Sequence, residues 1–484
     1  MVARRDLVLL AALVVGLSCG TNYSFSAYAP QIASKLSLSS TQTNLVGSMG
    51  NLGVYLTSPL IGRIVDRKGP VPTLVFALVA LSAGYLVVRL FYQGGTEAGS
   101  AFDTLGVVGL AAAQFAIGAG STAGLSSAGN SVAKSYKKKR AAALSVVLSG
   151  FGLSAFWYSS ISSLLLHRHA KRDTTSDFLL LLSIGCAVSM AVGLAFVRPV
   201  LYPSLAPPVP PSTGEVETAA AAVPVEEEIG RSERTPLLRT ISSKSVEERN
   251  VAGGALLREL DFYLIFLFNG LCAGIGLTII NNLGTIVRSL AQHAEHPPSA
   301  RQIALTQSRL VSLLSFCNFL GRLISGFGSD HLVHHHNQQR RLPRVWWLCL
   351  TSTLFLLSQL AFMSVTSVDT LAGPTVLVGL AHGALFGISG IIGLERFGMA
   401  NFSTNNGILA LAPAFFGQST NLIFGRIYDS HTSSSPSTRS TGSCAAGRAC
   451  YLSALHLTTG MAISAIGIAF VLATTRQKMK IRAA

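Results

Sequence analysis

Charged side chains are scarce in this sequence. Only 12% of its 484 residues are Asp, Glu, Lys or Arg, whereas a soluble domain carries about 25%. The mean hydropathy is +0.49, and several apolar runs approach the length of about 20 residues at which a helix crosses a bilayer. The strands of a membrane β-barrel would be only about ten residues long, with apolar and polar residues in alternation. We therefore predict an all-α membrane protein.

Several signatures of catalysis and ligand binding are also missing. No GxxxxGK[ST] phosphate loop occurs, so we do not expect an ATP-driven pump. The sequence offers no nucleophile–base pair, so we expect neither an enzyme nor a bound cofactor or metal. The adjacent histidines of stretch 331–341 indicate a solvated loop, with metal binding as the alternative. We assign the net charge of +16 to loops beside membrane spans, not to nucleic-acid binding.

Twelve apolar segments are predicted as membrane-spanning helices, in two groups of six. A Pro-rich and acidic stretch between the groups is expected to be a disordered linker in the cytoplasm. The predicted domains are a first bundle over 1–197, the linker over 198–258, and a second bundle with a short basic tail over 259–484. The predicted spans are 6–29, 41–62, 72–92, 104–133, 141–165, 177–197, 259–287, 304–327, 345–365, 371–394, 403–426 and 451–473.

The loops give the expected orientation. Those on one side of the predicted membrane hold more than twice as many Lys and Arg residues as those on the other. By the positive-inside rule, both termini are then cytoplasmic. We interpret the first apolar segment as an uncleaved span rather than a signal peptide, and we expect a monomer.

A charged motif, "GRIVDRKGP", follows the second predicted span and contains Gly62, Asp66 and Arg67. A glycine lets a neighbouring helix approach closely, and a carboxylate is favoured near a helix N-terminus. A weaker copy, "GFGSD", follows the eighth span and contains Gly326 and Asp330. The repetition after about half of the chain indicates two related halves, as in many transporters.

The first motif resembles the Gly-x-x-x-Asp-Arg-x-Gly signature between spans 2 and 3 of the major facilitator superfamily. This resemblance implies two pseudo-symmetric six-helix bundles. It also implies that Asp66 meets span 11 and holds one conformation shut, as a latch. Arg67 would form an ion pair at the membrane surface or serve only as a topology anchor.

The stretches 20–69 and "CAAGRACY" (444–451) are similar to the nodulin-like branch and to fungal vacuolar homologues of monocarboxylate permeases. These likenesses imply a secondary transporter of a small solute, such as an organic anion, that works by alternating access across the vacuolar membrane. The plasma membrane is the alternative location. A membrane sensor that kept the transporter fold is the alternative function.

Polar side chains within spans should face the bundle or a water-filled path, where they line the path or tie helices together. Arg322 shares its helix face with other polar residues and presents a planar fork suited to a carboxylate. The related permeases use an Arg in this span; a role in the latch is the rival interpretation, and Arg309 is the second candidate. The predicted pathway residues are Asn22, Tyr23, Asn51, Tyr55, Gln114, Asn269, Asn318, Arg322, His382 and Gln418.

No Asp or Glu lies near the middle of any predicted span. Proton-coupled carriers usually hold the proton on a membrane carboxylate. We therefore predict a facilitator, or coupling through His382 or through the substrate itself. His382 is alternatively a packing residue.

Two further features lie outside the spans. Cys444 and Cys450 share one loop on the non-cytoplasmic side, where disulfides persist, so we expect them to pair. In the linker, Glu233, Leu237 and Leu238 match the acidic dileucine pattern that sorting adaptors bind.

Overall fold

The computed structural model describes most of the chain outside the predicted linker. The described residues are 2–38, 40–136, 139–166, 175–200, 250–296, 298–333, 343–433, 444 and 446–482. Within these ranges the chain forms helices and no strand, which confirms the predicted fold class. Ranges 1–200 and 249–484 make up one compact unit. The sorting pattern of Glu233, Leu237 and Leu238 lies outside the described residues.

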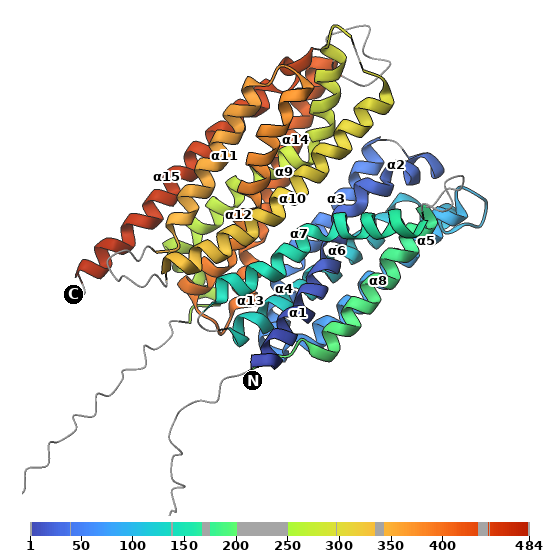
Figure 1. Ribbon diagram of the computed structural model, residues 1–484. Helices are drawn as coiled ribbons and strands as arrows, with labels where there is room; N and C mark the ends of the chain where they lie inside the picture. The colour runs from blue at the N-terminus through green and yellow to red at the C-terminus, as the bar shows by residue number, and fades with distance from the viewer. Residues whose placement is uncertain are drawn as a thin grey trace, which may run out of the picture. The chain divides into compact units, whose positions relative to one another are not determined.

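The first half of the chain forms helices α1 to α8. They are α1 (Val2–Cys19), the 3₁₀ turn η1 (Thr21–Ser24), α2 (Phe25–Lys35), α3 (Ser40–Leu56), α4 (Ser58–Lys68), α5 (Pro70–Gly94), α6 (Ala101–Ser135), α7 (Arg140–Leu166) and α8 (Thr175–Phe196). Figure 1 shows α1, α5, α6, α7 and α8 running together.

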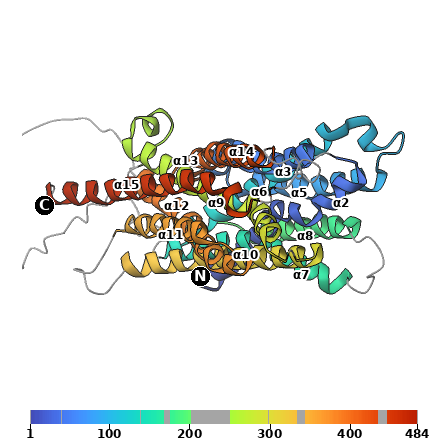
Figure 2. The same ribbon diagram turned by 90° about the horizontal axis from the view of Figure 1, so that it is seen from above.

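The second half forms helices α9 to α15, of which α9, α10, α11, α12 and α15 also run side by side (Figures 1 and 2). They are η3 (Gly253–Arg258), α9 (Leu260–His293), α10 (Ala300–Val333), α11 (Trp346–Ser364), η5 (Val368–Leu371), α12 (Ala372–Phe397), α13 (Phe402–Leu409), α14 (Leu411–Ser433), η6 (Gly447–Cys450) and α15 (Leu452–Arg482).

Eleven helices among the described residues are long and apolar enough to cross a membrane. The one predicted span without such a helix is the second, 41–62, which is divided into α3 and α4 at Thr57. Pro59 explains the division, because proline has no N–H to donate to the carbonyl four residues earlier. The Thr57 hydroxyl also donates to the Gly53 carbonyl at 2.7 Å, a side-chain bond that bends helices.

Span 11 is divided in the same way, into α13 and α14 at Ala410. Pro413 follows the break by three residues and removes another helical hydrogen bond. Because of this break, α13 is a separate helix of eight residues. This short helix is central to the candidate site.

Each half has its own apolar core. One cluster of buried residues runs from Val8 to Val197 and the other from Val251 to Ala473. Large apolar side chains such as Leu60, Val79 and Phe415 remain exposed, as expected of a surface in contact with lipid. The two cores lie in the ranges predicted as two bundles, and the boundaries of those domains stay a prediction.

Two small buried clusters join the halves. The first packs Ala133, Ala141 and Leu144 against residues of α12, α13 and the loop between them. The second packs Val54 and Tyr55 of α3 against Ala414 of α14. The halves therefore pack against each other at two places: around the loop between α12 and α13, and where α3 meets α14.

The last residues of the predicted linker are folded in the structure. Residues 253–258 form η3, and the Leu256 side chain is fully buried in the core of the second half. Ordered structure therefore extends into the last residues of the predicted linker, and the domain boundary at 258 stays a prediction. Burial of Leu256 and three hydrogen bonds of Asn250 and Val251, described below, fix this segment, which contains none of the prolines and acidic residues of the linker.

Candidate functional site

Asp66 lies at the N-terminus of α13 in the other half. Its carboxylate accepts hydrogen bonds from the backbone N–H groups of Ser403 (3.1 Å) and Thr404 (2.7 Å), and from the Thr404 hydroxyl (2.8 Å). The first N–H groups of a helix have no partner within the helix, and the helix dipole favours an anion there. Asp66 thus accepts hydrogen bonds from N–H groups in the first turn of span 11, the span that the family resemblance implies as its partner.

Glycines allow α4 and α13 to approach this closely. A Cβ added to Gly62 would lie 2.1 Å from the Ser403 carbonyl oxygen, and one added to Gly407 would lie 2.4 Å from the Ser58 carbonyl oxygen. No side chain fits into either space. The pair of glycines therefore sets the crossing of the two helices and brings Asp66 within reach of the α13 amides.

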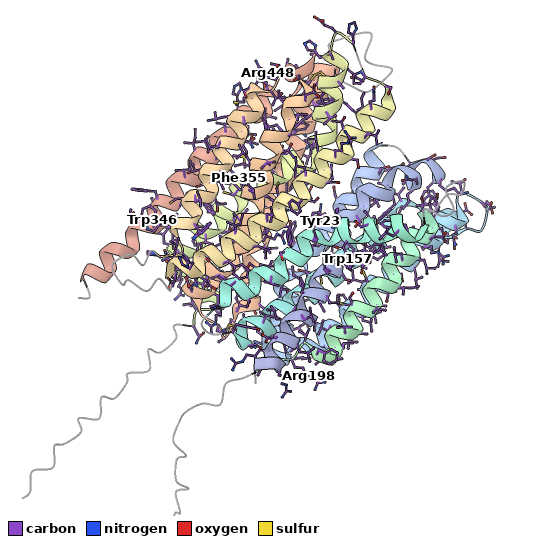
Figure 3. The ribbon with its side chains drawn as sticks, in the orientation of Figure 1. Tyr23, Trp157, Arg198, Trp346, Phe355 and Arg448 are labelled. Carbon is purple, nitrogen blue, oxygen red and sulfur yellow. A yellow bond between two sulfur atoms is a disulfide. The ribbon has the colours of Figure 1, made fainter. Side chains whose placement is uncertain are left out.

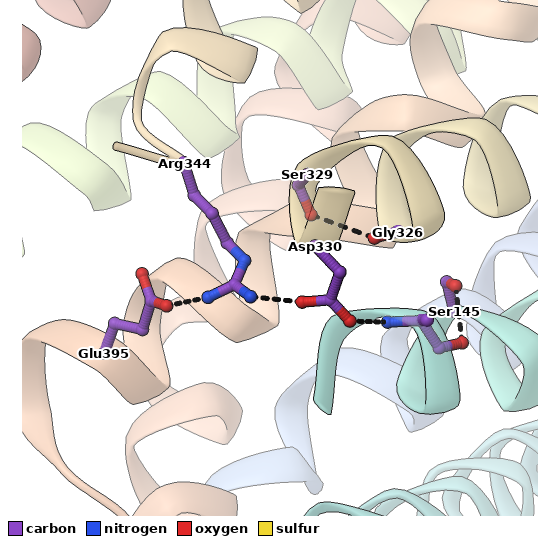
Figure 4. Close-up of polar contacts among 7 residues, drawn as sticks. Ser145, Gly326, Ser329, Asp330, Arg344 and Glu395 are labelled. Atoms are coloured by element: carbon purple, nitrogen blue, oxygen red, sulfur yellow. Dashed lines mark hydrogen bonds and ion pairs between the residues drawn. The ribbon is translucent and has the colours of Figure 1, made fainter. Parts of the chain in front are cut away.

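Asp330 makes the corresponding contact from the second half to the first (Figure 4). Its carboxylate accepts a hydrogen bond from the Ala142 N–H at 2.9 Å, in the first turn of α7. A Cβ added to Gly326 would lie 2.0 Å from the Ser145 hydroxyl oxygen. We call these two contacts, Asp66 with α13 and Asp330 with α7, the latch, and the end of the helices that carries them the latch end.

The two parts of the latch differ in charge. Asp330 forms an ion pair with the buried Arg344, which also pairs with Glu395 of α12 (Figure 4). Asp66 instead accepts a hydrogen bond at 2.9 Å from the neutral Asn130 amide of α6. Arg67 is exposed, and no ion pair of Arg67 is found within the described ranges, so its role as an ion-pair partner or a topology anchor stays a prediction.

Arg322 lies between the halves. It projects from α10, its side chain is only 4% exposed, and it donates to the Leu148 carbonyl of α7 in the first half. Its Nε donates to Asn318 Oδ1 at 3.1 Å. The guanidinium also lies 5.3 Å from the ring centre of Phe151 and 5.7 Å from that of Phe386.

The partners of Arg322 are all neutral. Across the described ranges, every Asp and Glu lies in a loop or within about two turns of a helix end, and none pairs with Arg322. Burial of a cation is costly without an opposite charge. A carboxylate ligand would supply that charge, and the planar guanidinium fork fits one.

Three other predicted pathway residues surround Arg322. Tyr23 packs edge-on against Phe151, whose ring also flanks the guanidinium, and both Tyr23 and Tyr55 lie close enough to Arg322 to interact with its charge. His382 is also within range of Arg322, packs edge-on against Phe386, and has no described hydrogen-bond partner at Nδ1. The structure thus brings Tyr23, Tyr55, Asn318 and His382 together around one cation.

The remaining predicted pathway residues lie elsewhere. Asn22 donates to Asn51 at 3.0 Å and Gln114 donates to the Tyr28 hydroxyl at 2.8 Å, both within the first half. Asn269 is buried, and its side-chain oxygen has no hydrogen-bond partner in the described part of the chain. Gln418 is half-buried on α14. The Asn22–Asn51 and Gln114–Tyr28 hydrogen bonds fit the alternative interpretation, in which polar residues connect helices and do not line a substrate path.

Three contact residues escaped the sequence analysis as members of the site. Asn130 sits in span 4, where its polar side chain was the available signal. For Arg344 and Glu395, the available signal was a charge near the end of a predicted span. The Leu148 carbonyl has no side-chain signal at all, so its bond to Arg322 could not be predicted.

A disulfide joins Cys444 and Cys450 at the end of the helices away from the latch. Figure 3 shows Arg448, between the two cysteines in sequence, at that end and Arg198 near the N-terminus at the other. The Cys444 N–H donates to the Tyr428 hydroxyl at 3.0 Å, and Arg448 donates to the Met363 carbonyl at 2.7 Å. The loop thereby connects the ends of α14, α11 and α15.

Comparison with known proteins agrees with this geometry. The chain is 25% identical to the protein named probable transporter mch1 of Emericella nidulans, over 90% of this chain and 81% of that protein. Among solved structures it is similar to a bacterial homologue of the human lysosomal transporter Spinster, inward-facing and unoccupied (TM-score 0.55, 16% identity, 98% of each chain). It is also similar to the human organic anion transporter MFSD10 (TM-score 0.54, 14% identity, 96% of this chain and 98% of that one).

The family model described as Major Facilitator Superfamily matches residues 10–412. That range includes both parts of the latch and Arg322. The chain therefore belongs to the Major Facilitator Superfamily.

Proposed function

We propose that this protein is a secondary transporter that carries a small organic anion by alternating access, with Arg322 as the cation that binds it. The observation that carries the proposal is the burial of Arg322 between the halves with only neutral partners. A buried, uncompensated guanidinium favours an anionic ligand. The likeness to a structure named as an organic anion transporter supports the same substrate class.

The neighbours of Arg322 suggest how the anion is held. Two phenylalanine rings flank the guanidinium and would pack against the apolar part of a ligand. The Tyr23 and Tyr55 hydroxyls, which interact with the charge of Arg322, would donate to a second carboxylate oxygen. Since Tyr55 belongs to the first half and Arg322 to the second, one ligand would bridge both halves.

The latch contacts indicate which end of the transporter is closed. With Asp66 and Asp330 each bound to a helix start in the opposite half, the latch end is closed. We propose that this end faces the cytoplasm, as the loop charges predict, and that alternating access breaks both contacts. The protein is either a facilitator, which moves the anion down its own gradient, or a carrier in which His382 or the substrate couples transport to protons.

The direct test is uptake into vesicles. Purified protein in sealed liposomes should accumulate radiolabelled carboxylates above protein-free liposomes, with and without an imposed proton gradient. A dependence on the gradient would identify coupling. Specific binding of a carboxylate without any uptake would instead support a sensor and refute transport.

We further propose a vacuolar location, on the strength of the family resemblance and the pattern of Glu233, Leu237 and Leu238. Replacing both leucines by alanine should move a fluorescently tagged protein to the plasma membrane. Unchanged vacuolar staining would remove the dileucine pattern as the signal, and staining of the plasma membrane before any substitution would contradict the location.

A further inference from the structure

Asn250 and Val251, which we call the strap, cross the loop between α12 and α13. The Val251 N–H donates to the Phe397 carbonyl at 2.8 Å, and the Val251 carbonyl accepts from the Asn405 amide at 2.8 Å. The Asn250 side-chain oxygen accepts from the Ala400 N–H at 3.0 Å. Two residues thus bind one helix end, one loop and the next helix.

Each of these hydrogen bonds satisfies a group that the helices leave open. The last carbonyls of a helix have no partner within the helix, and the Val251 N–H pairs with the one at Phe397. The chain then turns sharply at Gly398, whose φ of 88° suits glycine, and this leaves the Ala400 N–H facing the strap. Asn405 is buried, and within the described ranges the strap is the only hydrogen-bond partner of its amide nitrogen.

The strap and Asp66 hold adjacent residues of α13 from opposite halves. Asp66 binds Ser403 and Thr404, and the strap binds Asn405. The break at Ala410 separates α13 from α14, so α14 alone does not fix the orientation of α13. The strap continues into η3, whose Leu256 is buried in the second half.

We propose that the strap is a third part of the latch: it holds α13 on the second half, in the orientation that Asp66 requires. Two consequences follow. When the latch opens, α13 moves with the second half and the bonds to Asp66 break. When the strap is weakened, α13 tilts at Ala410 and the closed state is less populated, although neither Asp66 nor its partners have changed.

A cysteine reporter at the contact between α4 and α13 tests this without a transport substrate. Ser58 is 6% exposed, and its carbonyl packs against Gly407. We would label Ser58→Cys with a water-soluble maleimide in nanodiscs of the full chain, with Cys349→Ser to remove the one free cysteine in the described ranges that is not buried. The labelling rate then reports how often the latch is open.

Asn250→Ala and Asn405→Ala should each speed labelling about fivefold, which corresponds to one neutral hydrogen bond of about 1 kcal/mol. Asn250→Asp is the matched control: it keeps an oxygen acceptor for the Ala400 N–H and should label at the parent rate. Asp66→Asn should label faster still. Equal rates for Asn250→Ala and Asn250→Asp would overturn the proposal.

Hydrogen exchange provides a second readout, independent of the reporter. The amides of residues 405–409 should exchange faster in Asn250→Ala and Asn405→Ala than in the parent or in Asn250→Asp, because α13 is held less firmly. Unchanged exchange of these amides in both alanine variants would overturn the proposal, whatever the maleimide rates.

Discussion

Asp66→Asn should open the latch with a minimal change in shape. The parent carboxylate accepts four hydrogen bonds, at 3.1, 2.7, 2.8 and 2.9 Å, from Ser403, Thr404 and Asn130. Asparagine keeps one oxygen and puts an NH₂ group where the other was. In either orientation that group meets a backbone N–H, of Ser403 or of Thr404, so at least one hydrogen bond is lost and the rest become bonds to a neutral side chain.

The size of the effect follows from these bonds. A hydrogen bond to a charged group contributes about 1.5–3 kcal/mol and a neutral one about 1 kcal/mol, and an anion at a helix N-terminus adds about 0.3–1 kcal/mol. Asp66 is half-buried, so we take values near the lower limits. The closed state should lose about 2 kcal/mol relative to the open state, a shift of about 30-fold in the equilibrium.

Maleimide labelling of Ser58→Cys measures this shift. The rate should rise about 30-fold in Asp66→Asn, and Asp66→Glu should fall between the two because its longer side chain keeps the charge but not the reach. A rise of less than about threefold would refute the reasoning, since it would mean that Asp66 is bonded equally well in both states.

Three further outcomes follow from the same contacts. Asp330→Asn should lower the melting temperature more than Asp66→Asn, because it removes one of the two carboxylates that pair with the buried Arg344 and leaves only Glu395, at a cost of up to about 3 kcal/mol. Equal melting temperatures would argue against an ionic second part of the latch. Gly62→Ala should speed labelling of the latch end, since its Cβ has no space, whereas Gly460→Ala has nothing within 4 Å and should be neutral; similar behaviour of both would contradict the close crossing. Cys444→Ser should destabilise the fold by about 2 kcal/mol, seen as a lower melting temperature that reducing agent does not lower further.

The positions of most spans could be predicted from the sequence because apolar runs of about 20 residues have few alternatives. The exceptions are instructive. Pro59 and Pro413 divide spans 2 and 11, and both prolines were visible in the sequence. An apolar run of about 20 residues predicts one continuous span. Each of these prolines nevertheless removes a helical hydrogen bond and allows the helix to break. The division at Ala410 is what makes α13 a separate helix.

The site was less predictable. That Asp66 binds span 11 was implied by the family resemblance. The contact is chemically reasonable, because a carboxylate is favoured at the N-terminus of a helix. The partner of Arg322 in the first half is a backbone carbonyl, and the partners of Asn405 and Phe397 are backbone groups of Val251, which lies within the range predicted as a linker. Backbone partners leave no pattern in a sequence, because every residue offers the same N–H and C=O groups.

The central claim is that Arg322 binds an anion between the two halves. Uptake of radiolabelled acetate, pyruvate and benzoate into liposomes, compared among the parent, Arg322→Gln and Arg309→Gln, tests it most directly. Arg309 lies on the same helix but is exposed, so its variant makes the same charge change without affecting the site. Arg322→Gln should abolish uptake, whereas Arg309→Gln should retain it. Full uptake by Arg322→Gln, or equal loss in both variants, would contradict the claim.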